Sequence, residues 1–314
     1  MMKHLGFAVV ATLGGCTLNA GEDDGFPSAA GTSTGSEPAG SSDSSTTGEV
    51  TVDEGSSSTT STAPKLDVGA PETDADLGCS AVDFLFVVDS SESMREEQEN
   101  LVQNFPAFIG GIESTLDNVS SFHVGVIATS PYAFNNVACQ DLGALITQTG
   151  GNNSSATVCS PYASGENYMT EADELATKFA CAAQVGTLGS GMETPLDAIE
   201  NAVDGSLAGP GGCNEGFLRD DALLVIVIIT DEGGEDAQAD ADHYVDVVEM
   251  AKLGNKENAV VVTFLNPLTI NVRLRTFTQS FLPNAFEGNV SEDYADSFAQ
   301  AVEVVGTACQ NFAG

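Results

Sequence analysis

The chain has 314 residues, with 46 acidic against 9 basic side chains and a formal net charge of −37. This length accommodates one large domain and an extension. This strongly negative electrostatic field repels nucleic acid and anionic lipid headgroups and attracts divalent cations. We therefore expect no nucleic-acid partner. The same acidity also suits a protein that only has to remain soluble, for example in a salty environment.

The first residues have the pattern of an export signal. Lys3 and His4 precede an apolar stretch, residues 5–13, which is too short to span a bilayer. The sequence L-G-G-C that ends at Cys16 resembles the lipobox of bacterial lipoproteins. This resemblance implies a signal peptide over residues 1–15, a lipid on Cys16 and, because Thr17 is not Asp, the outer membrane. The alternative is an ordinary signal peptide cleaved after Ala20.

Residues 16–78 are rich in Ser, Thr, Gly, Pro and acidic residues, with almost no large apolar side chains. Such a composition cannot bury enough surface to offset the entropy lost on ordering, so we expect a disordered linker. Its flexible part, roughly 55 residues, would have an r.m.s. reach of about 40 Å. A lipid anchor and this tether would present a folded domain, residues 79–314, away from the membrane.

The folded part alternates between strand and helix patterns, which predicts an α/β fold with a mostly parallel central sheet and helices on both faces. The apolar run A-L-L-V-I-V-I-I-T is expected to be the central strand. The expected strands are residues 84–88, 122–128, 222–230 and 259–265, with short ones near 145–146 and 285. Helices are expected after the first strand and over residues 171–183, 196–203, 240–253, 274–281 and 292–305.

A group of oxygen-bearing side chains follows the first strand. The five apolar residues 84–88 are typical of a strand buried on both faces, and Asp89, Ser91 and Ser93 come directly after it. In open α/β sheets, ligands bind beyond the carboxyl ends of the strands. One carboxylate and two hydroxyls suit Mg²⁺, Ca²⁺ or Mn²⁺ and not zinc or copper.

These residues resemble the metal-ion-dependent adhesion site of the von Willebrand factor type A (vWA) family, whose signature is D-x-S-x-S after a buried first strand. The family's second-loop threonine matches Thr194 in G-M-E-T-P-L, and its later aspartate matches Asp231 in I-I-T-D-E. The resemblance covers about residues 79–309. It implies a three-layer, vWA/Rossmann-like fold and a cation, Mg²⁺ or Ca²⁺ with Mn²⁺ as a third choice. The implied ligands are Asp89, Ser91, Ser93, Thr194 and Asp231, the last binding directly or through water.

Each of these residues also has a structural interpretation. Ser93 and Glu96 form an S-x-x-E capping box, Thr194 can cap a helix before Pro195, and Asp231 can be an ordinary loop carboxylate. The motif is short, and D-S-S-T-T at residues 43–47 also matches it, in a polar tract with no strand before it. The apolar strand before Asp89 therefore adds most of the weight.

The chain departs from the family pattern through extra acidic residues. Glu92 lies beside the anchor, Glu193 stands where the family often has glycine, and Asp231 is followed by E-G-G-E-D. These acids could bind the metal themselves, shift the preference toward Ca²⁺, or repel an acidic ligand.

Seven cysteines less Cys16 leave six, and in an exported protein an even number predicts three disulfides. The domain ends lie close together in the vWA family, so the resemblance implies a pair between Cys79 and Cys309. The other four permit three connectivities. We favour Cys139–Cys159 and Cys181–Cys213, which close shorter loops. A zinc site is the rival interpretation, but the chain contains no C-x-x-C spacing.

We expect a non-enzymatic, monomeric binding module for a protein or polysaccharide. The vWA resemblance implies that an acidic group of this partner would complete the coordination of the cation. The irregular stretch of residues 130–171 is where we expect specificity to lie. One alternative is an architectural envelope protein with a purely structural metal. Another is a Mg²⁺-dependent hydrolase, although phosphatases with an aspartate after the first strand need a second one where this chain has Ser91. Only the lipid would touch the membrane, and the domain would face the periplasm or the cell surface.

Overall fold

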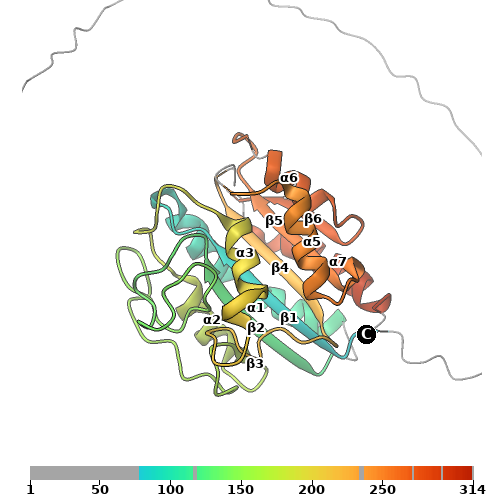
Figure 1. Cartoon of the computed structure of the whole chain (residues 1–314), viewed down its shortest axis with the longest axis horizontal. Coiled ribbons are helices and arrows are strands. Elements are labelled where there is room, and N and C mark those ends of the chain that lie inside the picture. The colour runs from blue at the N-terminus through green and yellow to red at the C-terminus, as the bar shows by residue number, and fades with distance from the viewer. Residues whose placement is uncertain (1–77, 116–118, 233–236, 271, 291–292, 313–314) are drawn as a thin grey trace, which may run out of the picture. The chain divides into compact units, whose positions relative to one another are not determined.

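A six-stranded sheet forms the centre of the domain (Figure 1). The computed structural model describes residues 78–312 apart from 116–118, 233–236, 271 and 291–292. The strand order is β3-β2-β1-β4-β5-β6, and every neighbouring pair is parallel except β2 with β3. The strands are β1 (Ala81–Val88), β2 (Ser121–Ala128), β3 (Met169–Thr170), β4 (Leu223–Thr230), β5 (Ala259–Leu265) and β6 (Ala285–Asn289). The predicted α/β fold is therefore confirmed.

Helices cover both faces of this sheet. One face packs against α1 (Arg95–Thr115), α2 (Leu175–Ala183) and α7 (Tyr294–Gln310). The other face packs against α3 (Pro195–Val203), α5 (Ala241–Ala251) and α6 (Val272–Gln279). The remaining helical segments are the short α4 (Gly205–Ala208) and two 3₁₀ turns, Glu92–Met94 and Lys256–Asn258. The three layers follow from strands that are apolar on both sides.

Alternate side chains of β1 supply both cores. Phe84 packs edge-on against Phe108 of α1 and Phe86 against Phe179 of α2, with ring centroids 5.7 and 4.7 Å apart. Leu85, between them, belongs to the core under α3, α5 and α6. Each such side chain contributes roughly 1.5–3 kcal/mol through burial. β1 is thereby held rigidly at the centre of the sheet.

The register brings the carboxyl ends of three neighbouring strands, β1, β2 and β4, together. Val88, the last residue of β1, pairs with Ala128 of β2 and with Ile229 of β4. Asp89, Thr129 and Thr230 consequently lie next to one another in space, although they are far apart in the sequence.

Several element boundaries differ from those predicted. No strand forms over residues 145–146, and the edge strand is Met169–Thr170. The helix predicted from residue 171 begins at Leu175, because the Asp173 carboxylate accepts hydrogen bonds from the backbone of Thr170 and Ala163 and holds a turn there. The last helix extends to Gln310, five residues beyond its predicted end.

Three disulfides join the six cysteines of the described part of the chain. Cys79 is bonded to Cys309, which is the pair that the family resemblance implies. The pairing that we favoured for the other four is wrong: Cys139 is bonded to Cys213 and Cys159 to Cys181. Loop length could not decide this question, because doubling a loop changes its closure free energy by only about 0.6 kcal/mol. The spatial neighbours decide it, and these pairs have Cα atoms 5.7 and 5.5 Å apart.

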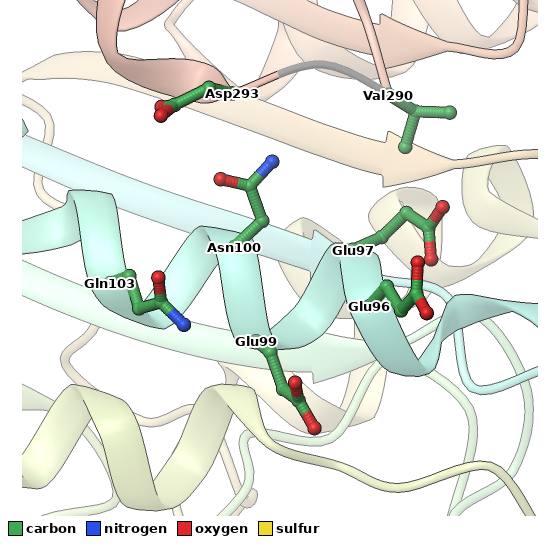
Figure 2. A pocket seen from close by; sticks show the side chains of 7 residues that line it. All are labelled: Glu96, Glu97, Glu99, Asn100, Gln103, Val290 and Asp293. Carbon is green, nitrogen blue, oxygen red and sulfur yellow. The ribbon is translucent and has the colours of Figure 1, made fainter.

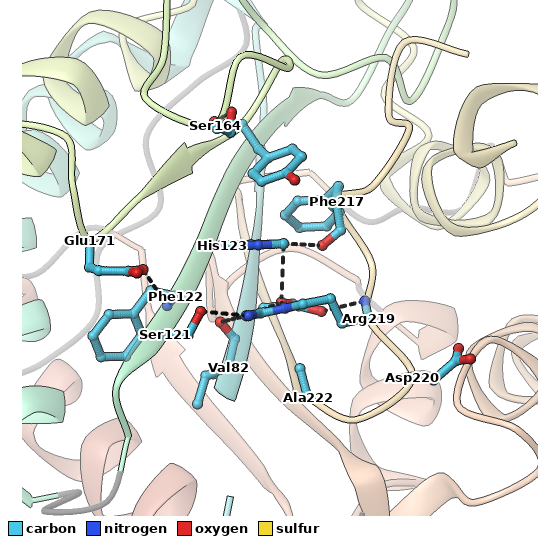
Figure 3. Close-up of polar contacts among 12 residues, drawn as sticks. Val82, Ser121, Phe122, His123, Ser164, Glu171, Phe217, Arg219, Asp220 and Ala222 are labelled. Carbon is cyan, nitrogen blue, oxygen red and sulfur yellow. Dashed lines mark hydrogen bonds and ion pairs between the residues drawn. The ribbon is translucent and has the colours of Figure 1, made fainter. Parts of the chain in front are cut away.

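A charged cluster lies near the start of β1, at the opposite end of the strand from Asp89; Figure 3 shows Arg219 beside Ser121 and Val82 there. The Asp83 carboxylate is fully buried and accepts hydrogen bonds from the backbone and guanidinium of Arg219, at 2.7 and 2.8 Å. Arg219 also donates to Ser121 Oγ at 2.7 Å. Lys252, 1% exposed, donates to the backbone oxygens of Arg219 and Ala222. These bonds attach residues 219–222 to the start of the sheet.

The predicted signal peptide, lipidated Cys16 and linker lie outside the described residues, except Gly78 at the end of the linker. In the part that is described, no helix is long and apolar enough to cross a bilayer. Disulfides are typical of exported proteins, and the three in this domain indicate export.

Candidate metal centre

Asp89 is the anchor of the site, immediately after β1. Its carboxylate is fully buried and is held from both sides: Oδ1 accepts from the Ser91 backbone N–H at 2.7 Å and Oδ2 from Thr230 Oγ1 at 2.5 Å. Its backbone N–H donates to Ile229 O of β4. The orientation of this carboxylate is therefore fixed by two neighbouring strands.

Ser91 and Ser93 complete the first loop. Their hydroxyl oxygens lie 3.3 Å apart, and Ser91 is buried while Ser93 is exposed. Gln98 of α1 braces this loop, since its side chain donates to Asp89 O at 2.8 Å and also bonds the backbone of Gly186. The alternative interpretation of Ser93 as a helix cap does not apply in the described structure, because Ser93 lies inside the 3₁₀ turn and helix α1 begins only at Arg95.

The second loop brings Thr194 to the end of β2. Its backbone N–H donates to Thr129 O at 2.9 Å and its hydroxyl approaches the same oxygen at 3.4 Å. Thr194 directly precedes α3, with Pro195 as the first helical residue, but its side chain makes no capping hydrogen bond. Its hydroxyl is therefore not needed to start the helix.

Glu193, next to Thr194, is the residue whose position the sequence did not reveal. It is 1% exposed, and Oε2 accepts a hydrogen bond from Thr129 Oγ1. Its other oxygen, Oε1, is buried without a hydrogen-bond partner. The only signal in the sequence was the acidic residue at a position where the vWA family often has glycine.

Asp231 follows β4 and is half-buried. Its Oδ1 is buried without a hydrogen-bond partner, while its backbone oxygen accepts from Thr269 Oγ1 at 3.0 Å. Thr230 links it to the anchor, because the Thr230 hydroxyl donates to Asp89 and accepts from the Glu232 backbone N–H. The structure thus brings all three predicted segments to one edge of the sheet.

These carboxylates act on one another electrostatically. Burial raises the pKa of Asp89, and the charge of Asp231 adds to the effect against the hydrogen bonds from Thr230 and Ser91. Burial also raises the pKa of Glu193 to about 8, reinforced by the charges of Asp89, Glu232 and Asp231. Among the described residues, no Lys or Arg forms an ion pair with Asp89, Glu193 or Asp231. The site is a concentration of negative charge without a protein cation.

A further acidic cavity of about 310 Å³ opens between α1 and the start of α7 (Figure 2). Glu97, on the first turn of α1, has one carboxylate oxygen buried without a hydrogen-bond partner. Burial raises its pKa, and the charges of Asp231, Glu96 and Asp89 add to this. The lining residues are Glu96, Glu97, Glu99, Asn100, Gln103, Val290 and Asp293. The concentration of acidic side chains at the candidate site therefore continues along α1.

The donor set fits a hard divalent cation. It consists only of oxygens, and two buried carboxylate oxygens, on Glu193 and Asp231, lack a hydrogen-bond partner. In the described part of the chain, no three His, Cys, Asp or Glu side chains are arranged to hold one ion together. Hydroxyl oxygens of Ser91, Ser93 and Thr194 are therefore part of the candidate ligand set, beside the carboxylates.

No protein-family model and no curated protein matches this chain. Similar solved structures include proximal thread matrix protein 1 from the mussel byssus, in crystal form 2, at 12% identity over 74% of this chain and 50% of that one, with a TM-score of 0.42. A von Willebrand factor type A structure from Catenulispora acidiphila is 14% identical over 74% and 43%, with a TM-score of 0.38.

The byssus protein with a zinc occupied MIDAS motif is 13% identical over 73% of this chain and 49% of that one, with a TM-score of 0.39. The chain spans half or less of each of these structures. These likenesses are weak, with 12–14% identity and TM-scores of 0.38–0.42.

Proposed function

We propose that this chain is an exported, lipid-anchored interaction module whose vWA-like domain binds a protein or polysaccharide through a divalent cation, Mg²⁺ or Ca²⁺. The observation that carries this proposal is the fully buried Asp89 carboxylate, fixed by Ser91 and Thr230. Beside it lie the carboxylates of Glu193 and Asp231, which form no ion pair with a Lys or Arg among the described residues. The anchor would be a lipid on Cys16 in the outer membrane, and the domain would act as a monomer.

The cation would be held by Asp89, Ser91, Ser93 and Thr194, with Asp231 bound directly or through water. When bound, it offers a coordination position to an oxygen of the partner. The chain's own groups orient these ligands: Gln98 braces the first loop, and Thr129 positions Glu193 and Thr194.

We propose a binding role and not catalysis. Ser91 stands where a phosphatase of the aspartate type needs a second carboxylate. The two histidines of the domain are occupied elsewhere: His123 lies within 2.7 Å of Phe217 O, and His243 pairs with Glu200 on α3. Neither histidine is therefore a candidate general base at the Asp89 site.

Thermal melting of the full chain in EDTA, Mg²⁺, Ca²⁺ and Mn²⁺ tests the metal centre. We expect metal to raise the melting temperature of the wild type and not of Asp89→Ala. Asp43→Ala is the matched control, because Asp43 begins the other D-x-S-x-T match and should leave the response intact. A wild type that does not respond to any of the three ions would refute the proposal.

Binding of the labelled chain to isolated bacterial cell envelopes tests the interaction role. We expect binding that EDTA reverses and that Asp89→Ala lacks. Metal-dependent melting together with envelope binding that EDTA does not affect would instead indicate a purely structural metal.

A further inference from the structure

Glu193 is more deeply buried than its sequence position suggests. With 1% of its surface exposed, its carboxylate has given up almost all contact with water, and Thr129 Oγ1 replaces that water at only one of its two oxygens. Oε1 is left buried with no hydrogen bond. A buried, unsatisfied carboxylate oxygen costs several kcal/mol unless a positive charge or a donor completes it.

The charged groups around Glu193 indicate what kind of partner its Oε1 atom would take. The charges that act on it belong to Asp89, Glu232 and Asp231, with Asp89 the strongest of the three. No Lys or Arg of the described chain pairs with it. Thr129, which holds Oε2, follows β2 and is bonded through its backbone N–H to Val88 O, immediately before Asp89. Glu193 and Asp89 are thereby attached to the same two strand ends.

We propose that Glu193 Oε1 is a ligand of the cation that Asp89 anchors, and that the position left for a partner takes a neutral oxygen and not a carboxylate. This inference rests on the proposed function, because it requires a cation at this site. In this arrangement Asp89 and Glu193 bind the cation directly and Asp231 acts through water, so two carboxylates are direct ligands. Their two negative charges balance a divalent ion, and Asp231 makes the site net negative.

The charge balance determines the kind of partner. A site with few carboxylates leaves positive charge on the ion and can attract a partner's carboxylate. Here the ion is already neutralised within the chain, and an approaching carboxylate meets Asp231 and Glu97 as well, whose charges reach the site. A hydroxyl or carbonyl oxygen avoids this repulsion. We therefore expect a polysaccharide or a peptide backbone to supply the last ligand.

A cavity beside the site has the matching chemistry. It has a volume of about 510 Å³, and most of its polar side chains are neutral. It is attached to the metal loop, because the Gly189 N–H donates to Ser90 O at 2.9 Å. A Cβ on Gly189 would lie 2.0 Å from Ser90 Oγ, so only glycine allows this approach. The lining residues are Glu92, Arg95, Asn152, Asn153, Thr187, Leu188, Gly189, Ser190 and Gly191.

Calorimetric titration of the full chain with Ca²⁺ and Mn²⁺ tests Glu193 as a ligand. Glu193→Gln keeps an acceptor for Thr129 and removes the charge, so we expect it to fold and to raise the cation Kd by a factor of at least about ten. Glu96→Gln removes one exposed charge nearby and should leave Kd within about twofold. Melting in EDTA checks folding, where Glu193→Gln should be at least as stable as the wild type because burial opposes a charge at this position and Gln carries none.

The outcomes separate the two proposals. If the wild type binds neither ion, the proposed function fails. If the wild type binds and Glu193→Gln binds equally well or more tightly, only the role of Glu193 is refuted. If Asp89→Ala abolishes binding and Glu193→Gln weakens it, both stand.

Acetate is the probe for the partner's chemistry. Water-proton relaxation of bound Mn²⁺ reports on the water that remains on the ion. Rising acetate at constant ionic strength should leave this signal unchanged in the wild type and lower it in Glu193→Gln, where a position and a charge have become free. Displacement of water by acetate in the wild type would overturn the exclusion of carboxylates.

Discussion

The two ends of strand β1 place the same chemical group in opposite surroundings. Asp83 and Asp89 are six residues apart and both are fully buried. Asp83 is paired with Arg219, whose guanidinium lies 2.6 Å from its carboxylate, and Lys252 is near. Asp89 has hydroxyl and amide donors but no ion pair with a Lys or Arg of the described chain. The described chain thus provides a positive counter-charge for Asp83 but not for Asp89, where a bound cation could supply it.

Burial dominates at both ends. It raises the pKa of Asp83 to about 6 even though Arg219 acts in the opposite direction. It also raises the pKa of Asp89, where the neighbouring Asp231 works in the same direction as burial. The charged neighbours, and not the depth of burial, therefore distinguish a structural carboxylate from one suited to a cation.

Arg219→Leu should produce the largest effect, because it leaves Asp83 buried without its partner. We expect the free energy of unfolding to fall by about 3–5 kcal/mol, equally in EDTA and in Ca²⁺. Arg95→Leu is the control: Arg95 is exposed and, among the described residues, its ion pair is with Glu99 on its own helix, a contact of about 0–1 kcal/mol. Urea denaturation measures both. Loss of less than about 1 kcal/mol in Arg219→Leu would contradict a structural role for this cluster.

The disulfide between Cys139 and Cys213 secures the segment that leads to Arg219. Replacing both residues with Ser should cost about 2–4 kcal/mol without changing cation affinity. The pair Cys159 and Cys181 spans 22 residues instead of 74, so in the loop-entropy account its removal should cost about 1 kcal/mol less. Denaturation without reductant measures both, and peptide mapping of the intact chain checks the pairing. A change in cation Kd would show that the two ends are coupled.

Asp89→Asn tests the other end of the strand. At a cation concentration a hundred times Kd, metal should stabilise the wild type by about 2.7 kcal/mol, and the variant should lose this gain. In EDTA the same variant should not be less stable than the wild type, because its carboxylate faces other negative charges. Denaturation with and without Ca²⁺ measures this. A large loss in EDTA would mean that Asp89, like Asp83, is structural.

Most of the fold could be predicted because it depends on local patterns. The runs before Asp89 and Asp231 are apolar on both faces, which identifies β1 and β4 and places the residues that follow them at one edge. Asp89, Ser91 and Asp231 were predicted to lie there in this way, whereas Thr194 was predicted only through the family resemblance. The edge strand at Met169 could not be found, because two residues carry no periodicity.

The contacts that complete the site are long-range and leave no local trace. Glu193 becomes buried because Thr129, 64 residues earlier, holds its carboxylate, and Arg219 meets Asp83 across 136 residues. The prediction of the disulfide pairing failed for the same reason, because the bonded Cys139 and Cys213 are 74 residues apart in the sequence. The composition showed an excess of acidic residues. Only the structure distinguishes a carboxylate paired with Arg or Lys, such as Asp83, from one without such a pair among the described residues, such as Asp89.

The smallest effect is expected at His123, beside the Asp83 cluster. Phe217 O can only accept, so His123 Nδ1, 2.7 Å away, carries the hydrogen, and Asp83 Oδ1 is 3.6 Å from the same nitrogen. Burial lowers the pKa of His123 below 6.5, with Arg219 acting in the same direction against the Phe217 carbonyl and the charges of Glu171 and Asp221. The unfolded chain therefore binds the proton first, so the contribution of His123 to stability is present above pH 6.5 and is lost as the pH falls through its folded pKa.

The measurement is the difference in unfolding free energy between the wild type and His123→Gln, in EDTA, as the pH falls from about 7 to about 5. We expect the wild type to lose stability relative to the variant over this range. Protonation of Asp83, whose pKa of about 6 lies in the same window, favours the folded state in both proteins and largely cancels in the difference. If the wild type instead becomes more stable relative to His123→Gln as the pH falls, Asp83 stabilises the protonated form of His123. The Asp83 end of β1 would then carry more negative charge than Arg219 and Lys252 neutralise.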